Sequence, residues 1–305
     1  MVPHQLGKRG LPKPPPLLLG RCSLLDRRTR HQVHIRNVTN RQHLSSPAVL
    51  SSSHNLLEFL STMSRLTDYR VLTFDCFGTI IDWESGVVAA LQPLLEANYA
   101  ESGFTREQLL SVYHKCEATL QQMTPGLNYD QLLTELLPII AHKLSLRPPS
   151  AEQSAAFGAS VGSWPAFPDS VDALRRLSKH YKLVILSNVD RESFTKTNAG
   201  PLQGIPFDLI ITAEDVGSYK PDPRNFEYML REVKDRFGAD RSEVIQTAQS
   251  QFHDHHPARK FGIKSSWIVS PGAIMGKIED EIYDWRFDTL GDMADAVEAE
   301  LQKKG

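Results

Sequence analysis

The stretch YRVLTFDCFGTIID, residues 69–82, contains the feature that decides the fold. A short apolar run at 71–74 is followed at once by Asp75 and then by a turn that contains a glycine. Short apolar runs bounded by turn residues are typical of strands buried on both faces of a parallel sheet. We therefore expect a β-strand at 71–74 that ends on an aspartate.

The chain after this stretch alternates short runs rich in Val, Ile and Leu with longer amphipathic segments. Such alternation is typical of strands and helices that build a parallel sheet. We expect further strands at 183–186, 209–212, 244–247 and 266–269, and helices at 170–180, 223–237 and 292–304. The pattern predicts an α/β fold with a doubly wound, Rossmann-like, mainly parallel sheet.

Residues 83–167 interrupt the alternation because their apolar positions follow helical spacing throughout. We interpret them as a helical cap domain inserted into a core formed by 63–82 and 168–305. Pro93 is expected to kink or restart the first cap helix. The repeating apolar positions are Val88, Leu91, Leu95 and Tyr99, then Leu109, Tyr113, Cys116 and Leu120, then Tyr129, Leu132, Leu136 and Ile140.

The first 62 residues differ in composition from the remainder. They hold nine Lys or Arg and two Asp or Glu, and they show no sustained periodicity, so a disordered basic extension is expected. An Arg- and Ser-rich, acid-poor leader is compatible with a mitochondrial transit peptide. The alternative is an untargeted or mis-annotated extension with Met63 as the working start. We expect a cytoplasmic protein, or a mitochondrial one if the extension is a transit peptide.

Charge, hydropathy and cysteine content argue against a nucleic-acid partner, a membrane span and a disulfide framework. Residues 63–305 carry 25 basic and 34 acidic residues, which argues against nucleic acid because phosphate binding needs a basic surface. No apolar run approaches the roughly 20 residues needed to span a bilayer. The three cysteines, Cys22, Cys76 and Cys116, are too few and too scattered for a disulfide framework.

Several polar residues stand at the predicted strand ends. Ligands of doubly wound sheets bind at the carboxyl ends of the strands. Asp75 follows the first strand, Ser187 and Asn188 follow the second, the third leads to Lys220, and the fourth leads to Asp254. An ionised aspartate can act as a nucleophile without a separate base, and an ammonium beside it keeps it anionic.

The turn after Asp75 has a composition suited to anion binding. Gly78 lets the backbone turn, so that N–H groups approach a substrate anion closely. Thr79 adds a hydroxyl group to the same turn.

Four motifs occur in order: DCFGT at 75–79, LSN at 186–188, YKPDP at 219–223 and AQSQFHD at 248–254. On these motifs the chain resembles the haloacid dehalogenase superfamily from Met63 onwards. Phosphatases of this superfamily carry a second aspartate where this chain has Phe77. They also carry a magnesium-binding aspartate where this chain has Gln249. The pattern is more similar to type II (S)-2-haloacid dehalogenases, which use neither metal nor cofactor and have an aromatic residue at the position of Phe77.

The resemblance implies a two-step hydrolysis. Asp75 would displace halide from the α-carbon of a small carboxylate substrate, and water would then attack the carboxyl carbon of Asp75 to release a 2-hydroxy acid. Lys220 would orient Asp75, and Asp254 would position Lys220 or the water. The implied substrate-binding residues are Phe77, Thr79, Ser187, Asn188, His114, Gln249 and Gln251.

Two departures from the family pattern leave the substrate open. His114 stands where the dehalogenases place an arginine that grips carboxylate and halide, although Arg106 could substitute for it. Gln249 and Gln251 replace small polar residues. A magnesium-dependent phosphatase and a catalytically inactive binding protein therefore remain alternatives, and a homodimer remains open.

Overall fold

A six-stranded parallel sheet forms the centre of the described chain. The computed structural model describes residues 64–100, 103–270, 272–276 and 280–304. All of them belong to one unit, residues 58–305. The predicted disordered extension at 1–62 lies outside the described residues, and so does the prediction about targeting.

The strands are ordered β3-β2-β1-β4-β5-β6, and all neighbouring pairs are parallel. The prediction of an α/β fold with a mainly parallel sheet is therefore confirmed. The last strand was not predicted, because three partly exposed residues do not form an apolar run. The bounds are β1 (Val71–Phe74), β2 (Lys182–Ser187), β3 (Leu209–Thr212), β4 (Val244–Ala248), β5 (Lys264–Ile268) and β6 (Trp285–Phe287).

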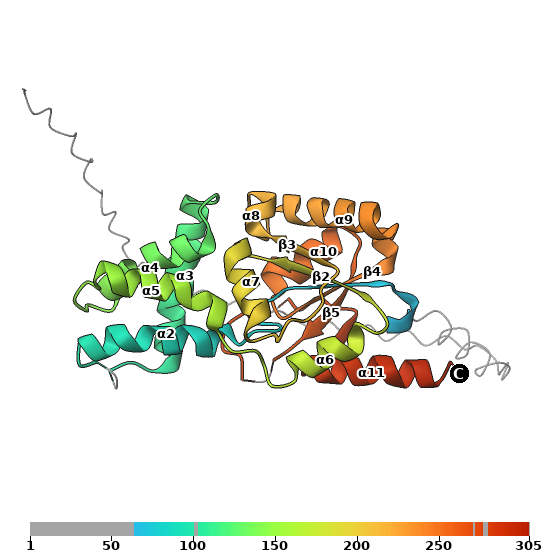
Figure 1. Cartoon of the computed structure of the whole chain (residues 1–305), viewed down its shortest axis with the longest axis horizontal. Coiled ribbons are helices and arrows are strands. Elements are labelled where there is room, and N and C mark those ends of the chain that lie inside the picture. The colour runs from blue at the N-terminus through green and yellow to red at the C-terminus, as the bar shows by residue number, and fades with distance from the viewer. Residues whose placement is uncertain (1–63, 101–102, 271, 277–279, 305) are drawn as a thin grey trace, which may run out of the picture. The chain divides into compact units, whose positions relative to one another are not determined.

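Helices cover both faces of the sheet, with α9 on one face and α6 and α11 on the other (Figure 1). Successive strand residues point to opposite faces, and Val71 and Leu72 accordingly belong to two different apolar clusters. Val71 packs in the cluster that contains Phe226 and Met229 of α9. The helices outside the 83–167 segment are α6 (Ser170–Leu177), α7 (Arg191–Ala199), α8 (Ala213–Val216), α9 (Pro223–Phe237), α10 (His256–Lys260) and α11 (Leu290–Gln302).

Four α-helices occupy the described part of residues 83–167, in agreement with the helical periodicity of that segment. They are α2 (Trp83–Ala97), α3 (Arg106–Met123), α4 (Tyr129–Lys143) and α5 (Ala151–Ala159). The limits of a separate cap domain stay a prediction. Of the two outcomes expected at Pro93, the restart is wrong, because α2 continues through it, and the kink stays a prediction. The missing N–H costs one hydrogen bond, and the buried face of α2 around Leu91, Leu94 and Leu95 holds the helix in place.

Short turns of helix connect several of these elements. They are the 3₁₀-helices η1 (Leu66–Asp68), η2 (Ser160–Ser163) and η3 (Arg241–Glu243), and the π-helix η4 (Gln251–His255).

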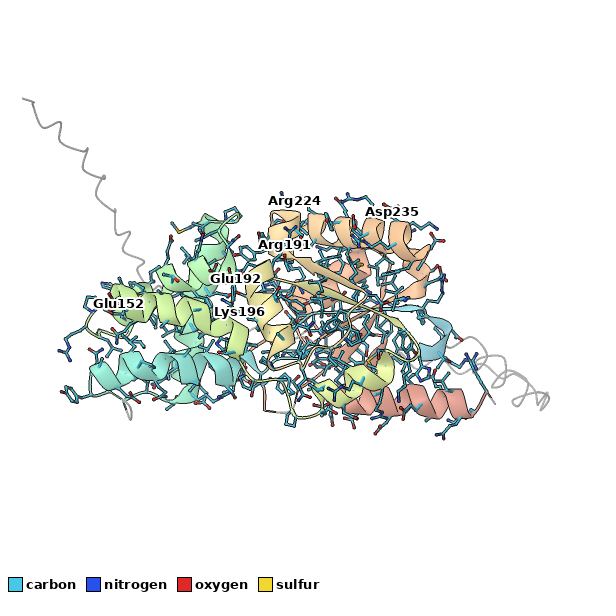
Figure 2. The ribbon with its side chains drawn as sticks, in the orientation of Figure 1. Glu152, Arg191, Glu192, Lys196, Arg224 and Asp235 are labelled. Carbon is cyan, nitrogen blue, oxygen red and sulfur yellow. The ribbon has the colours of Figure 1, made fainter. Side chains whose placement is uncertain are left out.

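Charged side chains lie on the outer helices, as the labelled residues of α7 illustrate (Figure 2). Lys196 Nζ lies 2.7 Å from Glu192 Oε1, and Arg191 pairs with Asp215 of α8. Within the part of the chain that the structure describes, no helix is both long and apolar enough to cross a membrane.

Candidate active site

Lys220 lies at the centre of the candidate site. Its Nζ donates hydrogen bonds to Asp75 Oδ1 at 2.9 Å, to Asp254 Oδ1 at 2.8 Å and to the carbonyl oxygen of Leu186 at 2.7 Å. Lys220 is 2% exposed and Asp254 is fully buried. An ammonium has three protons, so these acceptors use all of them.

The carboxyl end of β1 holds Asp75 in place. Its backbone N–H donates to the carbonyl oxygen of Thr247 on β4, at 3.1 Å. Its Oδ2 accepts a hydrogen bond of 2.8 Å from Thr79 Oγ1, and the same Thr79 oxygen accepts one of 2.9 Å from the N–H of Gln249. The strand order reverses between β1 and β4, and doubly wound sheets bind ligands at such a point.

Asn188 positions the backbone that carries Lys220. Its Oδ1 accepts a hydrogen bond from the N–H of Lys220 at 2.6 Å, and its Nδ2 donates to the carbonyl oxygen of Lys220 at 3.0 Å. Asp222 then caps α9, which begins at Pro223. Both polar groups of the Asn188 side chain are therefore bonded within the protein, and its role in substrate binding stays a prediction.

Burial and pairing shift the titration of the two partners of Asp75. Burial alone would lower the pKa of Lys220, but the carboxylates of Asp254 and Asp75 outweigh it and raise this pKa. Burial also raises the pKa of Asp254, and the nearby Lys220 opposes that shift. Lys220 therefore stays an ammonium at neutral pH, while Asp254 is closer to accepting a proton than an exposed aspartate.

A cavity of about 320 Å³ opens onto Asp75. Residues of the sheet core line it together with residues of α2, α3 and α4 and with Trp164, which follows η2. Five of the lining residues were predicted to bind substrate, and these are Phe77, His114, Ser187, Asn188 and Gln249. The lining also includes Trp83, Tyr113, Glu117, Gln121, Tyr129 and Trp164.

Two predicted substrate-binding residues lie elsewhere. Thr79 does not line the cavity, because its hydroxyl is used between Asp75 and the N–H of Gln249. Gln251 is fully buried, and its Oε1 accepts a hydrogen bond of 2.8 Å from the N–H of Ile282. Both side chains are hydrogen-bonded inside the protein, in the turn after β1 and in the π-helix η4, and their role in substrate binding stays a prediction.

Arg106 does not replace the family's cap arginine in this cavity. It lines a neighbouring cavity of about 400 Å³, where its Nη2 lies 3.3 Å from Glu84 Oε2. The two imidazoles of the first cavity supply no charge either. Burial lowers the pKa of His114, and burial together with Lys220 lowers that of His253 to about 4. Among the described lining residues, Lys220 is then the one cation.

The donor set does not fit a magnesium ion. Magnesium prefers carboxylate oxygens in octahedral geometry. Both oxygens of Asp75 and Oδ1 of Asp254 already accept hydrogen bonds, and Gln249 Nε2 donates to the carbonyl oxygen of Met275 at 3.0 Å. In the described ranges, no three Asp, Glu, His or Cys side chains converge in a way that could hold a metal.

Replacing Thr79 by valine will test the link between β1 and β4. Valine keeps the shape but removes the hydroxyl, so the buried N–H of Gln249 and one oxygen of Asp75 each lose a partner. A buried N–H left unpaired costs about 1–3 kcal/mol, and we expect a loss of that size in the free energy of unfolding in urea. Thr119→Val, at an exposed position of α3, should change it little. Equal stability of both variants would contradict the assigned contact.

A search against protein-family models matches residues 69–245 to the family described as haloacid dehalogenase-like hydrolase. The chain belongs to this family. The resemblance inferred from the four motifs is confirmed, and the protein is a hydrolase of the haloacid dehalogenase-like family.

Individual relatives of this hydrolase differ in activity. It is 26% identical to the (S)-2-haloacid dehalogenase of Pseudomonas sp. (strain YL), over 76% of this chain and 96% of the relative. It is 25% identical to the pyrophosphatase PpaX of Bacillus velezensis, over 75% and 97%. The solved L-2-haloacid dehalogenase of Xanthobacter autotrophicus has a TM-score of 0.61 at 19% identity, over 75% and 98%, which supports the fold alone.

Proposed function

We propose that the protein hydrolyses a small 2-haloacid without a metal ion, with Asp75 as covalent nucleophile. The observation that carries this proposal is the ammonium of Lys220, whose hydrogen bonds hold Asp75 and Asp254 side by side at the cavity. The similarity to the Pseudomonas (S)-2-haloacid dehalogenase supports the substrate class.

In the first step, an oxygen of Asp75 forms a bond to the carbon that bears the halogen. The carbon–halogen bond breaks, and its electron pair leaves with the halide, which needs no proton. Ser187 Oγ lines the cavity and is buried without a partner among the described residues. The N–H groups of Cys76 and Phe77 donate to no other described residue, so together with Ser187 Oγ they are suited to donate hydrogen bonds to the substrate carboxylate.

In the second step, water attacks the carboxyl carbon of Asp75. The ester bond to Asp75 breaks, and the product leaves with the oxygen that came from Asp75. The sum is a haloacid and water giving a 2-hydroxy acid, halide and a proton. Asp254 Oδ2 has no hydrogen-bond partner in the described chain, and its raised pKa suits it to take the proton of the water.

A single turnover in oxygen-18 water, with enzyme in excess over 2-chloropropionate, tests the ester intermediate. The proposed route puts label into the carboxylate of Asp75, and mass spectrometry of the peptide that contains it should detect the heavier mass. The released lactate should carry unlabelled oxygen in this turnover. Label in the lactate alone would mean that water attacks the substrate directly.

A magnesium-dependent phosphatase is the second candidate, favoured by the similarity to pyrophosphatase PpaX. A phosphoryl group would bring further negative charge to Asp75, and the donor set described above does not fit magnesium. Phosphate release from a phosphate monoester that stops on chelation with EDTA would favour this candidate. Chloride release that continues in EDTA would favour the dehalogenase.

A further inference from the structure

Glu117 is a carboxylate of α3 that lines the same cavity as Asp75. His114, Glu117 and Gln121 all line it, and their spacing of three and four residues puts them on one face of the helix. Neither composition nor motif singled out Glu117. Its carboxyl group lies on the α3 side of a cavity whose proposed substrate is also a carboxylic acid.

The cap contacts hold Glu117 in a defined orientation. Its Oε1 accepts hydrogen bonds from Gln121 Nε2 at 2.7 Å and from the hydroxyl of Tyr129 at 3.1 Å. The hydroxyl of Tyr113 lies 2.9 Å from that of Tyr129 and is able to donate to it, which completes a chain of donors towards Glu117. Oε2 accepts no hydrogen bond from any described residue, so it is available to a ligand.

No positive charge in the cavity lining balances this carboxylate. Lys220 is the one lining cation in the described ranges, and its three protons already bond to Asp75, Asp254 and the backbone. Arg106 is paired with Glu84 in the neighbouring cavity. A second anion at the cap end would therefore meet Glu117 with no cation beside it, whereas a donor group would find an acceptor.

We propose that Glu117 determines specificity, by making the enzyme prefer 2-haloacids that carry a hydrogen-bond donor, such as a hydroxyl or ammonium group, at the end facing α3. A carboxylate at that end is disfavoured. This inference rests on the proposed function, because it assumes that the substrate's first carboxylate lies near Ser187.

Burial raises the pKa of Glu117 to about 7, and the hydrogen bond from Tyr129 limits the rise. Below that pH the side chain is neutral and does not repel a carboxylate. Above it the side chain is anionic, so it accepts from a hydroxyl more strongly and repels a carboxylate. The preference should therefore grow as the pH rises from about 6 to about 8.

Halide release from three racemic substrates tests the proposal. They are 2-chloro-3-hydroxypropionate, 2-chloropropionate and chlorosuccinate, which end in a hydroxyl, a methyl and a carboxylate group. We expect kcat/KM to fall in that order, with about tenfold to a hundredfold between the first and the last. This ratio should increase with pH over the range given above.

Glu117→Gln is the decisive variant, because glutamine keeps an acceptor for Tyr129 and Gln121 but removes the charge. We expect the ratio between the hydroxyl and carboxylate substrates to fall by about tenfold and to lose its pH dependence. Glu135→Gln, at an exposed position of α4, should behave as the wild type. A ratio near one in the wild type, or one that Glu117→Gln leaves unchanged, would overturn the proposal.

Binding of the corresponding products separates this proposal from the proposed function. Trp83 and Trp164 line the cavity, so their fluorescence should report binding of glycerate, lactate and malate to the unmodified enzyme. We expect glycerate to bind more tightly than malate, and Glu117→Gln to reduce that difference. The same order without halide release from any substrate would overturn the proposed function and support the role of Glu117. Halide release without a difference in binding between glycerate and malate would support the proposed function and overturn the role of Glu117.

Discussion

Asp75→Asn will stop halide release from 2-chloropropionate, with a loss of roughly a thousandfold or more in kcat. An amide is not nucleophilic at neutral pH, so no ester forms. Lys220 keeps its hydrogen bonds to Asp254 and to the carbonyl oxygen of Leu186, so the site retains part of its scaffold. Chloride in the reaction mixture, measured by ion chromatography, gives the rate.

Asp235→Asn is the matched control, because Asp235 is exposed on α9 (Figure 2) and does not line the cavity. It should keep the wild-type rate. An asparagine at position 75 could regain activity slowly by hydrolysis of its amide, so Asp75→Ala should be measured beside it. Chloride release at the wild-type rate in both Asp75 variants would exclude the covalent route. Absence of chloride release in the wild type would favour the phosphatase or an inactive binding protein.

Lys220→Met will destabilise the fold as well as stop catalysis. Methionine fills a similar volume but leaves two buried carboxylates, Asp75 and Asp254, without their cation. Removing one partner of a buried ion pair costs about 3–5 kcal/mol, and we expect a loss of that size in the free energy of unfolding in urea. Lys234→Met is the control, because Lys234 pairs with Asp240 on the surface and its loss should have a small effect.

The destabilisation by Lys220→Met should depend on pH. Burial already raises the pKa of Asp254 and Lys220 limits that rise, so loss of the ammonium raises the pKa of Asp254 further. Stability is then lost as the pH rises, because folding must keep Asp254 protonated or bury its charge. The difference from the wild type should therefore be smaller near pH 5 than near pH 8. A difference that is independent of pH would mean that the unpaired carboxylate of Asp254 does not cause it.

Local patterns were sufficient to predict five of the six strands and the helical nature of the segment between β1 and β2. The strand β6 was not predicted because it is three residues long and only partly buried. The continuity of α2 through Pro93 was not predicted, because packing against neighbouring helices outweighs the low helix propensity of proline.

In the candidate site, too, some features could be predicted from the sequence and others could not. Asp75, Ser187, Lys220 and Asp254 lie at or after the carboxyl ends of parallel strands, so the sheet topology brings them to the same edge. The sequence positions of Gln251 and Thr79 lie beside the site, but only the folded chain shows that their side chains are hydrogen-bonded inside the protein.

The amino-acid order was enough to establish the α/β fold, the aspartate at the end of β1 and the family, because strand periodicity and motif spacing are local properties of the chain. Which side chains line the cavity could be seen only in the folded molecule. Glu117 and Tyr129 meet only when α3 packs beside α4, and Arg106 lies in the neighbouring cavity, in contact with Glu84 of α2. Such contacts join residues on different helices, and no spacing along the chain encodes them.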